Sequence, residues 1–154
     1  MQPGDHDLSP LCLELPASME NWDDLFGFVQ SEVHRCLGGH AKEYKLVLAC
    51  EELLSNMIRY NAGIADDGSP VTIRIHSGFV DGASPGTYQL QISDNGAAFN
   101  PRFDELDTSI AEVPIKRRQI GGLGLFLIKT SVDHVAYSYQ DHRNLYLIET
   151  QLDS

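Results

Sequence analysis

The chain has 154 residues, of which 42% are hydrophobic, and this is enough for one domain with a substantial buried core. Asp and Glu outnumber Lys and Arg by 22 to 11, which argues against a nucleic-acid surface because phosphate binding needs clustered cations. The apolar stretch Leu123 to Ile128 is too short to span a bilayer, and no apolar run follows Met1 as in a secretory signal. We therefore expect a cytoplasmic protein without a membrane or direct nucleic-acid partner, whose large partner surfaces contact protein.

The N-terminal half predicts one strand and two helices. Residues 1–10 mix Pro, Gly and charge and are expected to form a flexible lead, followed by a single domain over residues 11–154. Leucines alternate with other residues over 11–15, which predicts a half-buried strand. Apolar residues then recur at steps of three and four over 22–37 and again over 41–60, which predicts two amphipathic helices.

The C-terminal half changes to a period of two. Alternating segments at 71–75 and 88–92 predict two strands, and segments at 135–139 and 145–150 predict two more, separated by a turn over 140–144. Together with the helices, this order predicts an α+β fold, in which helices pack on one face of a mixed, mostly antiparallel sheet to form a two-layer sandwich.

A long connection separates the two pairs of strands. Residues 100–119 contain two prolines, several charges and little periodicity, which is typical of a functional lid or a disordered loop. A third helix is expected to begin near Gly122. Lys116, Arg117 and Arg118 form a basic cluster in the predicted lid. This cluster could contact a γ-phosphate or an acidic partner, and the alternative is a merely solvated loop.

The cysteines and histidines indicate neither a disulfide framework nor a zinc site. Cys12, Cys36 and Cys50 are odd in number and lack C-x-x-C spacing, so we interpret them as reduced, buried thiols. The histidines show no metal-ligand spacing, and His34 on the first predicted helix is interpreted as a partly exposed surface residue.

A first candidate for chemistry lies on the second predicted helix. Glu52 and Asn56 are four residues apart and share a helix face, with Arg59 one turn further on. An Asn side-chain oxygen can complete the octahedral shell of Mg²⁺, a carboxylate can act as a base, and a cation can neutralise phosphate. The alternative for this segment alone is a solvated helix face with ordinary polar pairs.

A second candidate is the segment Asp94-Asn95-Gly96, which ends an alternating strand. The Asp94 carboxylate can accept a hydrogen bond from an exocyclic amine, and Gly96 has no Cβ to keep a flat ring from the backbone, so the pair suits adenine. The alternative is an ordinary Asp-Asn-Gly turn of a β-hairpin.

A third candidate is the glycine cluster Gly121-Gly122-Leu123-Gly124-Leu125, which leads into the third predicted helix. Unpaired N–H groups at a helix N-terminus bind anions, and glycines let phosphates approach closely. The segment matches neither a P-loop nor a dinucleotide fingerprint, and its alternative is a flexible hinge.

The three segments occur together, in order, with the long loop between the second and third. In this arrangement the sequence resembles the GHKL ATPases, the superfamily of histidine kinases and gyrase, over nearly the whole chain. Glu52-x-x-x-Asn56 is similar to the N box of that superfamily. Asp94-x-Gly96 with Phe99 and Pro101 is similar to its G1 box, and Gly121-Gly122-x-Gly124-Leu125 to its G2 box.

The resemblance implies the Bergerat (GHKL) ATP-binding fold, with ATP and Mg²⁺ as cofactors. Within the superfamily the chain resembles the bacterial anti-sigma factor serine/threonine kinases. This likeness implies that Asn56 binds Mg²⁺, that Asp94 contacts adenine, and that Glu52 is the catalytic base toward a protein hydroxyl. It also implies a homodimer that binds an antagonist protein of the anti-anti-sigma type and a sigma factor. The cofactor-binding residues expected on these grounds are Asn56, Arg59, Asp94, Gly96, Phe99, Gly121, Gly122, Leu123, Gly124 and Leu125.

Two alternatives stay open at this point. One is a binding module that captures a regulator when nucleotide is bound but transfers no phosphate. The other is a stand-alone ATPase domain of the histidine kinase type, because residues 51–60 resemble that N box as much as the anti-sigma form.

Overall fold

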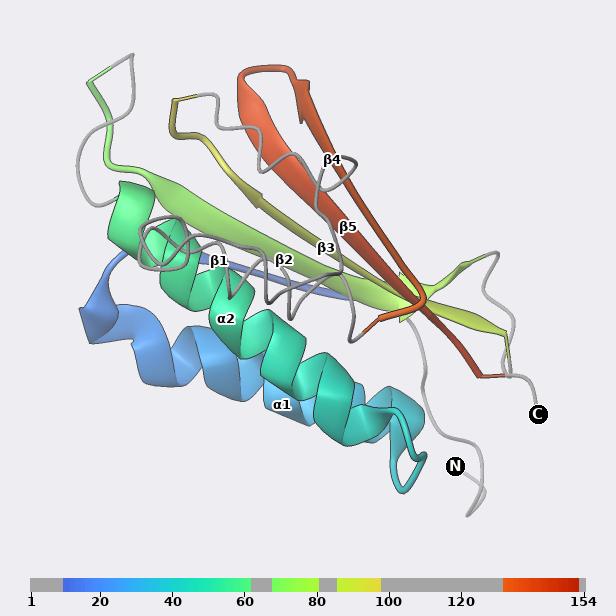
Figure 1. Ribbon diagram of the computed structural model, residues 1–154. Helices are drawn as coiled ribbons and strands as arrows, with labels where there is room; N and C mark the ends of the chain where they lie inside the picture. The colour runs from blue at the N-terminus through green and yellow to red at the C-terminus, as the bar shows by residue number, and fades with distance from the viewer. Residues whose placement is uncertain (1–9, 62–67, 81–85, 98–131, 153–154) are drawn as a thin grey trace, which may run out of the picture.

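The computed structural model describes residues 10–61, 68–80, 86–97 and 132–152, which form two layers (Figure 1). One layer is an antiparallel sheet and the other consists of two helices packed on one of its faces. The predicted α+β sandwich is thereby confirmed. The elements in chain order are β1 (Leu11–Pro16), the 3₁₀ turn η1 (Met19–Asn21), α1 (Trp22–Leu37), α2 (Glu43–Asn61), β2 (Thr72–Phe79), β3 (Thr87–Asp94), β4 (His134–Gln140) and β5 (Arg143–Gln151).

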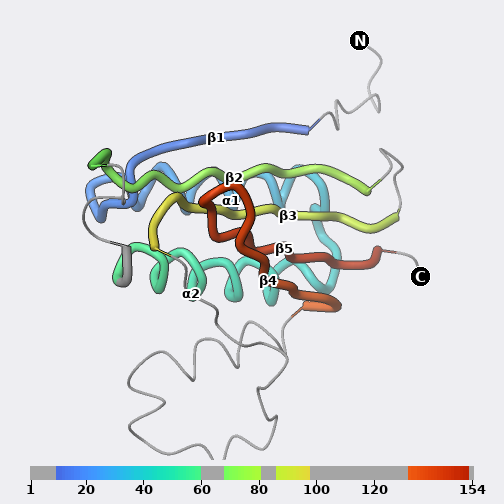
Figure 2. Tube along the Cα trace, turned by 90° about the horizontal axis from the view of Figure 1, so that it is seen from above, coloured from blue at the N-terminus to red at the C-terminus, as the bar shows by residue number. Residues whose placement is uncertain are grey.

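The strands lie in the order β1-β2-β3-β5-β4, as the view from above shows (Figure 2). β3 is therefore central, with β2 on one side and β5 on the other. Its last residue, Asp94, lies opposite Ile73 of β2 and Asn144 of β5. Each of the four described pairings is antiparallel, so the described part of the sheet is not mixed.

The core lies between the sheet and the helices. Because side chains alternate between the faces of a strand, every second residue of β2, β3 and β5 points to the helices. The fully buried residues of these strands include Ile73, Ile75, Leu90, Ile92 and Ile148. Helix positions spaced by three and four fill the other side: Leu25, Val29, Val33 and Leu37 from α1, and Leu46, Cys50, Leu53, Leu54, Met57 and Ile58 from α2.

Both helices follow their predicted pattern. The bounds of α1 agree with the prediction, whereas α2 begins two residues later than predicted, at Glu43. The reason is local, because Lys42 N donates to His40 Nδ1 at 3.1 Å and so forms a turn before the helix. His34 on α1 is 74% exposed and contacts Glu43, which confirms its interpretation as a surface residue. Among the described helices none is long and apolar enough to cross a membrane.

Two further expectations need correction. Only Cys50 of the three cysteines is buried, and burial raises the pKa of its thiol to about 12. Cys12 is exposed, because it lies on the edge strand β1 and points away from the helices. The turn between the last two strands is also shorter than predicted, since only Asp141 and His142 lie outside them. The predicted lid and third helix fall outside the described residues.

Candidate functional site

The carboxylate of Asp94 stands at the end of the central strand β3, on the face toward the helices, and is fully buried. Its Oδ1 accepts hydrogen bonds from Gly96 N and from Asn144 Nδ2, both at 2.9 Å. A buried carboxylate is stable only when such donors replace water, so these bonds hold Asp94 in one orientation.

The segment Asp94-Asn95-Gly96 is not the turn of a simple hairpin. Both neighbours of β3 are known, β2 and β5, and neither directly follows it in the chain. Asn95 turns toward β2, where its Oδ1 accepts a bond from Thr72 N at 2.7 Å. The segment therefore leaves the sheet as a turn fixed from both sides.

Asn144 is a site residue that sequence reasoning missed. It is 1% exposed, and besides Asp94 its Nδ2 also contacts the carbonyl oxygen of Ala97 at 2.9 Å. The hydroxyl of Tyr137 donates to Asn144 Oδ1. Asn144, Tyr146 and Ile148 alternate along β5 on the helix side, and this extended period-two pattern was the signal that could have identified the residue.

A second phenol borders the same carboxylate. Tyr146 is buried two residues after Asn144, and its pKa is raised, first by burial and then by the negative charge of Asp94. The ring therefore stays neutral over the physiological pH range. Tyr137 lies against it with ring centroids 5.3 Å apart. Gly96 N and Asn144 Nδ2, which donate to Asp94 Oδ1, are neutral groups, and the charge of Asp94 also attracts Arg143 electrostatically.

The residues predicted on α2 lie along one face of the helix and differ in their burial. Asn56 is 7% exposed, Glu52 is partly exposed and Arg59 is exposed. The Asn56 amide is unusual in that its buried Nδ2 has no hydrogen-bond partner among the residues that the structure describes. Leaving such a group unpaired costs about 1–3 kcal/mol, and so it marks a position suited to a ligand.

The two groups of residues come from elements that lie side by side. The C-terminal half of α2 runs beneath the end of the sheet at which β3 terminates, in both views of the chain (Figures 1 and 2). The structure thus brings Asp94, Gly96 and Asn144 together and places the helix of Asn56 next to them. The other predicted binding residues, Phe99 and the cluster Gly121 to Leu125, lie outside the described residues.

This arrangement can recognise a polar aromatic group and an anion at one end of the sheet. A fixed, buried carboxylate accepts hydrogen bonds from amines, and a primary amide offers both a donor and an acceptor. The Asn56 oxygen suits a divalent cation that keeps other oxygen ligands, while its NH₂ suits a phosphate oxygen.

A model of the histidine kinase-like ATPase domain matches residues 15–148, most of the chain. The chain belongs to this family. The resemblance to GHKL ATPases seen in the sequence is thereby confirmed. A relative within reach of sequence comparison is the serine-protein kinase RsbW of Listeria innocua, 30% identical over 98 residues. That match covers 62% of this chain and 58% of the relative, so the chain spans less than two thirds of that kinase.

The fold of the ATPase domain also recurs in a solved structure. A chain in the crystal structure of the SiaB–SiaC complex from Pseudomonas aeruginosa matches with a TM-score of 0.53 and 15% identity. The match covers 91% of this chain and 88% of the other. At this identity the likeness concerns the fold.

Proposed function

We propose that this ATPase-family chain binds ATP with Mg²⁺ and acts as a serine/threonine protein kinase of the anti-sigma type. In this proposal it phosphorylates an antagonist protein and sequesters a regulator such as a sigma factor. The name of the RsbW relative, a serine-protein kinase, supports the activity. The match to a chain of the SiaB–SiaC complex supports the proposal that this chain binds a second protein.

The observation that carries the proposal is the buried amide of Asn56, whose Nδ2 lacks a hydrogen-bond partner within the described part of the chain. A structural Asn in the core would have its donors satisfied, whereas one that awaits a ligand need not. Asn56 matches the N box position at which the family binds the cation. Its oxygen would hold Mg²⁺, which supplies charge neutralisation at the phosphates of ATP.

We assign recognition of the adenine ring to Asp94. The carboxylate would accept the exocyclic N–H of adenine, and Gly96 leaves room for the flat ring. Asn144 acts as a positioning residue, because its Nδ2 holds Asp94 Oδ1 at 2.9 Å. Phe99 belongs to this pocket by its place in the motif and lies outside the described residues.

We assign the phosphates to the glycine cluster and to Arg59. Gly121, Gly122, Leu123, Gly124 and Leu125 match the G2 box, and their backbone N–H groups would contact phosphate oxygens. Arg59 is exposed on the last turn of α2, where it can reach solvent and an anion.

Glu52 is the proposed catalytic base. It lies one helical turn from Asn56 and is partly exposed, so an incoming partner hydroxyl can reach it. The carboxylate would take the proton of that hydroxyl while the hydroxyl oxygen attacks the γ-phosphorus. The bond from the γ-phosphorus to the bridging oxygen then breaks, and ADP leaves with the electron pair.

The test is incubation of the purified protein with γ-labelled ATP, Mg²⁺ and a co-purified partner protein. The proposal expects label on a Ser or Thr of the partner. Nucleotide-dependent binding without label on any protein would favour the binding module. Release of labelled phosphate without a protein acceptor would favour the stand-alone ATPase domain.

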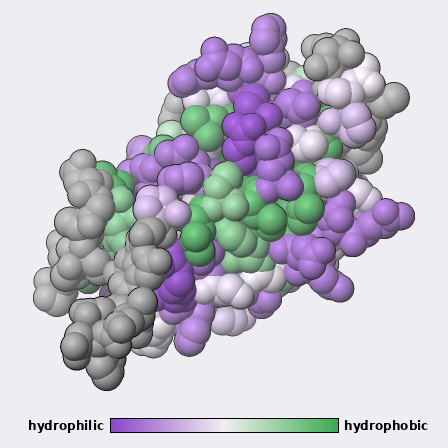
Figure 3. Space-filling view, turned by 180° about the vertical axis from the view of Figure 1, so that it is seen from behind, coloured by the Kyte–Doolittle hydropathy of each residue, from purple (hydrophilic) through white to green (hydrophobic). Residues whose placement is uncertain are grey.

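We further propose that the kinase is a homodimer joined along β1 and α1. Viewed from behind, where these elements lie, apolar side chains form one patch with hydrophilic residues around it (Figure 3). Leu13, Leu15 and Phe28 line a groove there of about 520 Å³, and Leu11 is 44% exposed. Within the described sheet β1 pairs only with β2, so a second copy can both cover the patch and pair with the free strand edge. Light scattering should give the dimer mass for the native chain and the monomer mass for Leu13→Glu.

A further inference from the structure

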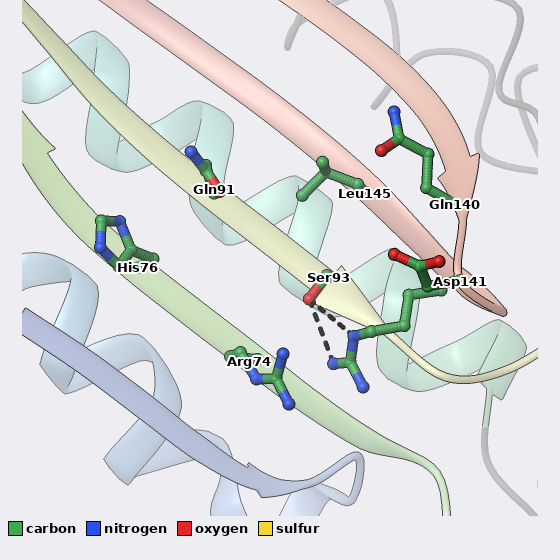
Figure 4. A pocket seen from close by; sticks show the side chains of 8 residues that line it. Arg74, His76, Gln91, Ser93, Gln140, Asp141 and Leu145 are labelled. Atoms are coloured by element: carbon green, nitrogen blue, oxygen red, sulfur yellow. Dashed lines mark hydrogen bonds between the residues drawn. The ribbon is translucent and has the colours of Figure 1, made fainter. Parts of the chain in front are cut away.

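The face of the sheet turned away from the helices carries a shallow cavity of about 210 Å³ (Figure 4). Side chains from four strands line it, among them Arg74 and His76 of β2, Gln91 and Ser93 of β3, Gln140 of β4 and Arg143 of β5; Asp141 lines it as well. In a chain with 22 acidic and 11 basic residues, two arginines in one cavity reverse the charge that prevails elsewhere.

Arg143 is held across β3 toward Arg74. Its Nε and Nη2 donate to Ser93 Oγ at 3.2 and 3.1 Å, the two dashed lines in Figure 4. Ser93 lies directly opposite Arg74 in the β2–β3 register, so the two arginines approach the same point from opposite sides. The hydroxyl is a neutral acceptor, and among the described residues no carboxylate lies within 4 Å of Arg143.

Arg74 has a carboxylate partner, but only a loosely held one. Its Nε and Nη2 lie 3.3 Å from Glu14 Oε1 on the β1 side, while Glu14 Oε2 accepts a shorter bond of 2.7 Å from Thr72 Oγ1. The pKa of Glu14 is lowered mainly by this Thr72 hydroxyl. The pKa of Arg143 is itself lowered, first by burial and then by the charge of Arg74. The two guanidinium groups therefore repel each other, while Glu14 and Asp94 act on the pKa of Arg143 in the opposite direction and Asp141 also lines the cavity.

The turn beside the cavity has an uncommon backbone. Asp141 and His142 both have positive φ, 53° and 61°, although neither is glycine. Such conformations cost about 1 kcal/mol or more, and Asp and His tolerate them better than most residues. This two-residue turn makes Arg143 the first residue of β5, opposite Gln140, and so sets the guanidinium at the cavity.

We propose that the cavity is a second anion site, separated by the sheet from Asp94 and Asn56, which binds the phosphate group of a small molecule between Arg74 and Arg143. Each guanidinium is a planar fork that can give two parallel, charge-assisted hydrogen bonds to phosphate oxygens. A tetrahedral phosphate can accept hydrogen bonds from two guanidinium groups on opposite sides. Its negative charge would also offset the repulsion between the two arginines. His76 and Gln91, which also line the cavity, carry further N–H donors for the remaining oxygens.

The experiment is a titration of the ¹⁵N-labelled full chain with inorganic phosphate at low ionic strength. We expect saturable amide shifts at Arg74, Ser93 and Arg143. Arg143→Gln should weaken phosphate binding at least about 10-fold, the loss expected for one charge-assisted contact. Lys45→Gln is the matched control, because it removes the same charge from an exposed position of α2 and should stay within about two-fold. A thermal melt of each variant shows that it is folded.

Several results would overturn the proposal. Shifts confined to α2 and the turn after β3 would place phosphate at the nucleotide site instead. Equal weakening by Arg143→Gln and Lys45→Gln would show attraction to net charge alone, and tighter binding of succinate than of phosphate would exclude a phosphate site. Phosphoserine serves as the second arm. Binding tighter than inorganic phosphate would identify a phosphate ester as the occupant, and weaker binding would identify free phosphate.

Discussion

The two faces of the sheet carry different polar chemistry one residue apart. Asp94 and Asn144 point toward the helices, with exposures of 0% and 1%, while the residues just before them, Ser93 and Arg143, point to the open face. On the covered face each polar group has to find a partner within the protein. On the open face solvent is available, so charges can remain without a carboxylate. Polar groups on the covered face are therefore fixed by their buried partners, whereas polar groups on the open face can still bind a ligand.

The largest expected effect concerns Glu52, the partly exposed residue at the margin of the covered face. Glu52→Gln should lower phosphate transfer about 10²–10⁴-fold, because a positioned base typically contributes that much. Nucleotide affinity should stay within a few-fold. Transfer to the partner protein is measured with labelled ATP under single-turnover conditions.

Glu51→Gln is the matched control for this change. Glu51 is also partly exposed, but it lies about 100° away from Glu52 around the helix axis. It should transfer phosphate at close to the native rate. Equal losses in both variants would remove Glu52 as the base.

The next prediction concerns the free energy of unfolding when an apolar residue is shortened on each face of the sheet. Ile92→Ala should lower the free energy of unfolding by about 2–5 kcal/mol, because Ile92 is fully buried beneath the helices. Leu145→Ala on the open face should cost about 1 kcal/mol or less, since Leu145 is only partly buried. Urea unfolding measures both. Similar costs would mean that the open face is covered in solution.

A third prediction separates Asp94 from its neighbour. Asp94→Asn should weaken binding of ATP about 10–100-fold, the loss of a charged acceptor, while inorganic triphosphate is affected less because it lacks adenine. Ser93→Ala should leave ATP affinity within about two-fold, because Ser93 points to the opposite face. Calorimetric titration with the two ligands tests this. Equal losses for both in Asp94→Asn would place the carboxylate away from the base.

The smallest effect belongs to the outer member of the buried network. Tyr137→Phe removes the hydroxyl that donates to Asn144 Oδ1 and should lower stability by about 0.5–1.5 kcal/mol. ATP affinity should fall only a few-fold, because Asn144 still holds Asp94. An unchanged urea midpoint would show that this hydrogen bond does not stabilise the fold.

Local patterns predicted much of the fold. Apolar spacing gave the bounds of α1, and alternation located the strands, because both depend on periods within one segment. Asp94 and Asn56 could also be predicted from the sequence, because the motifs are residue types at fixed spacing. Their roles in binding remain predictions.

What the sequence did not reveal depends on pairing between distant segments. Asn144 was assigned to a turn because it follows Asp141 and His142, yet its pairing with Asp94 and Tyr139 places it inside β5. The open-face cavity needs Arg74, Ser93 and Arg143 side by side, and only the strand order brings them together. Cys12 was expected to be buried, but the edge position of β1 exposes it.

We propose that Asn56 and Asp94 belong to an ATP site on the helix-covered face of the sheet. Calorimetric titration with ATP and Mg²⁺, on the native chain and on Asn56→Ala, measures whether this site binds nucleotide. We expect saturable binding by the native chain. The variant should lose most of the affinity and its Mg²⁺ dependence. It should stay folded, because Asn56 Nδ2 makes no hydrogen bond to any described residue. No binding by the native chain at millimolar ATP, or equal Mg²⁺-dependent affinity for both proteins, would contradict the proposal.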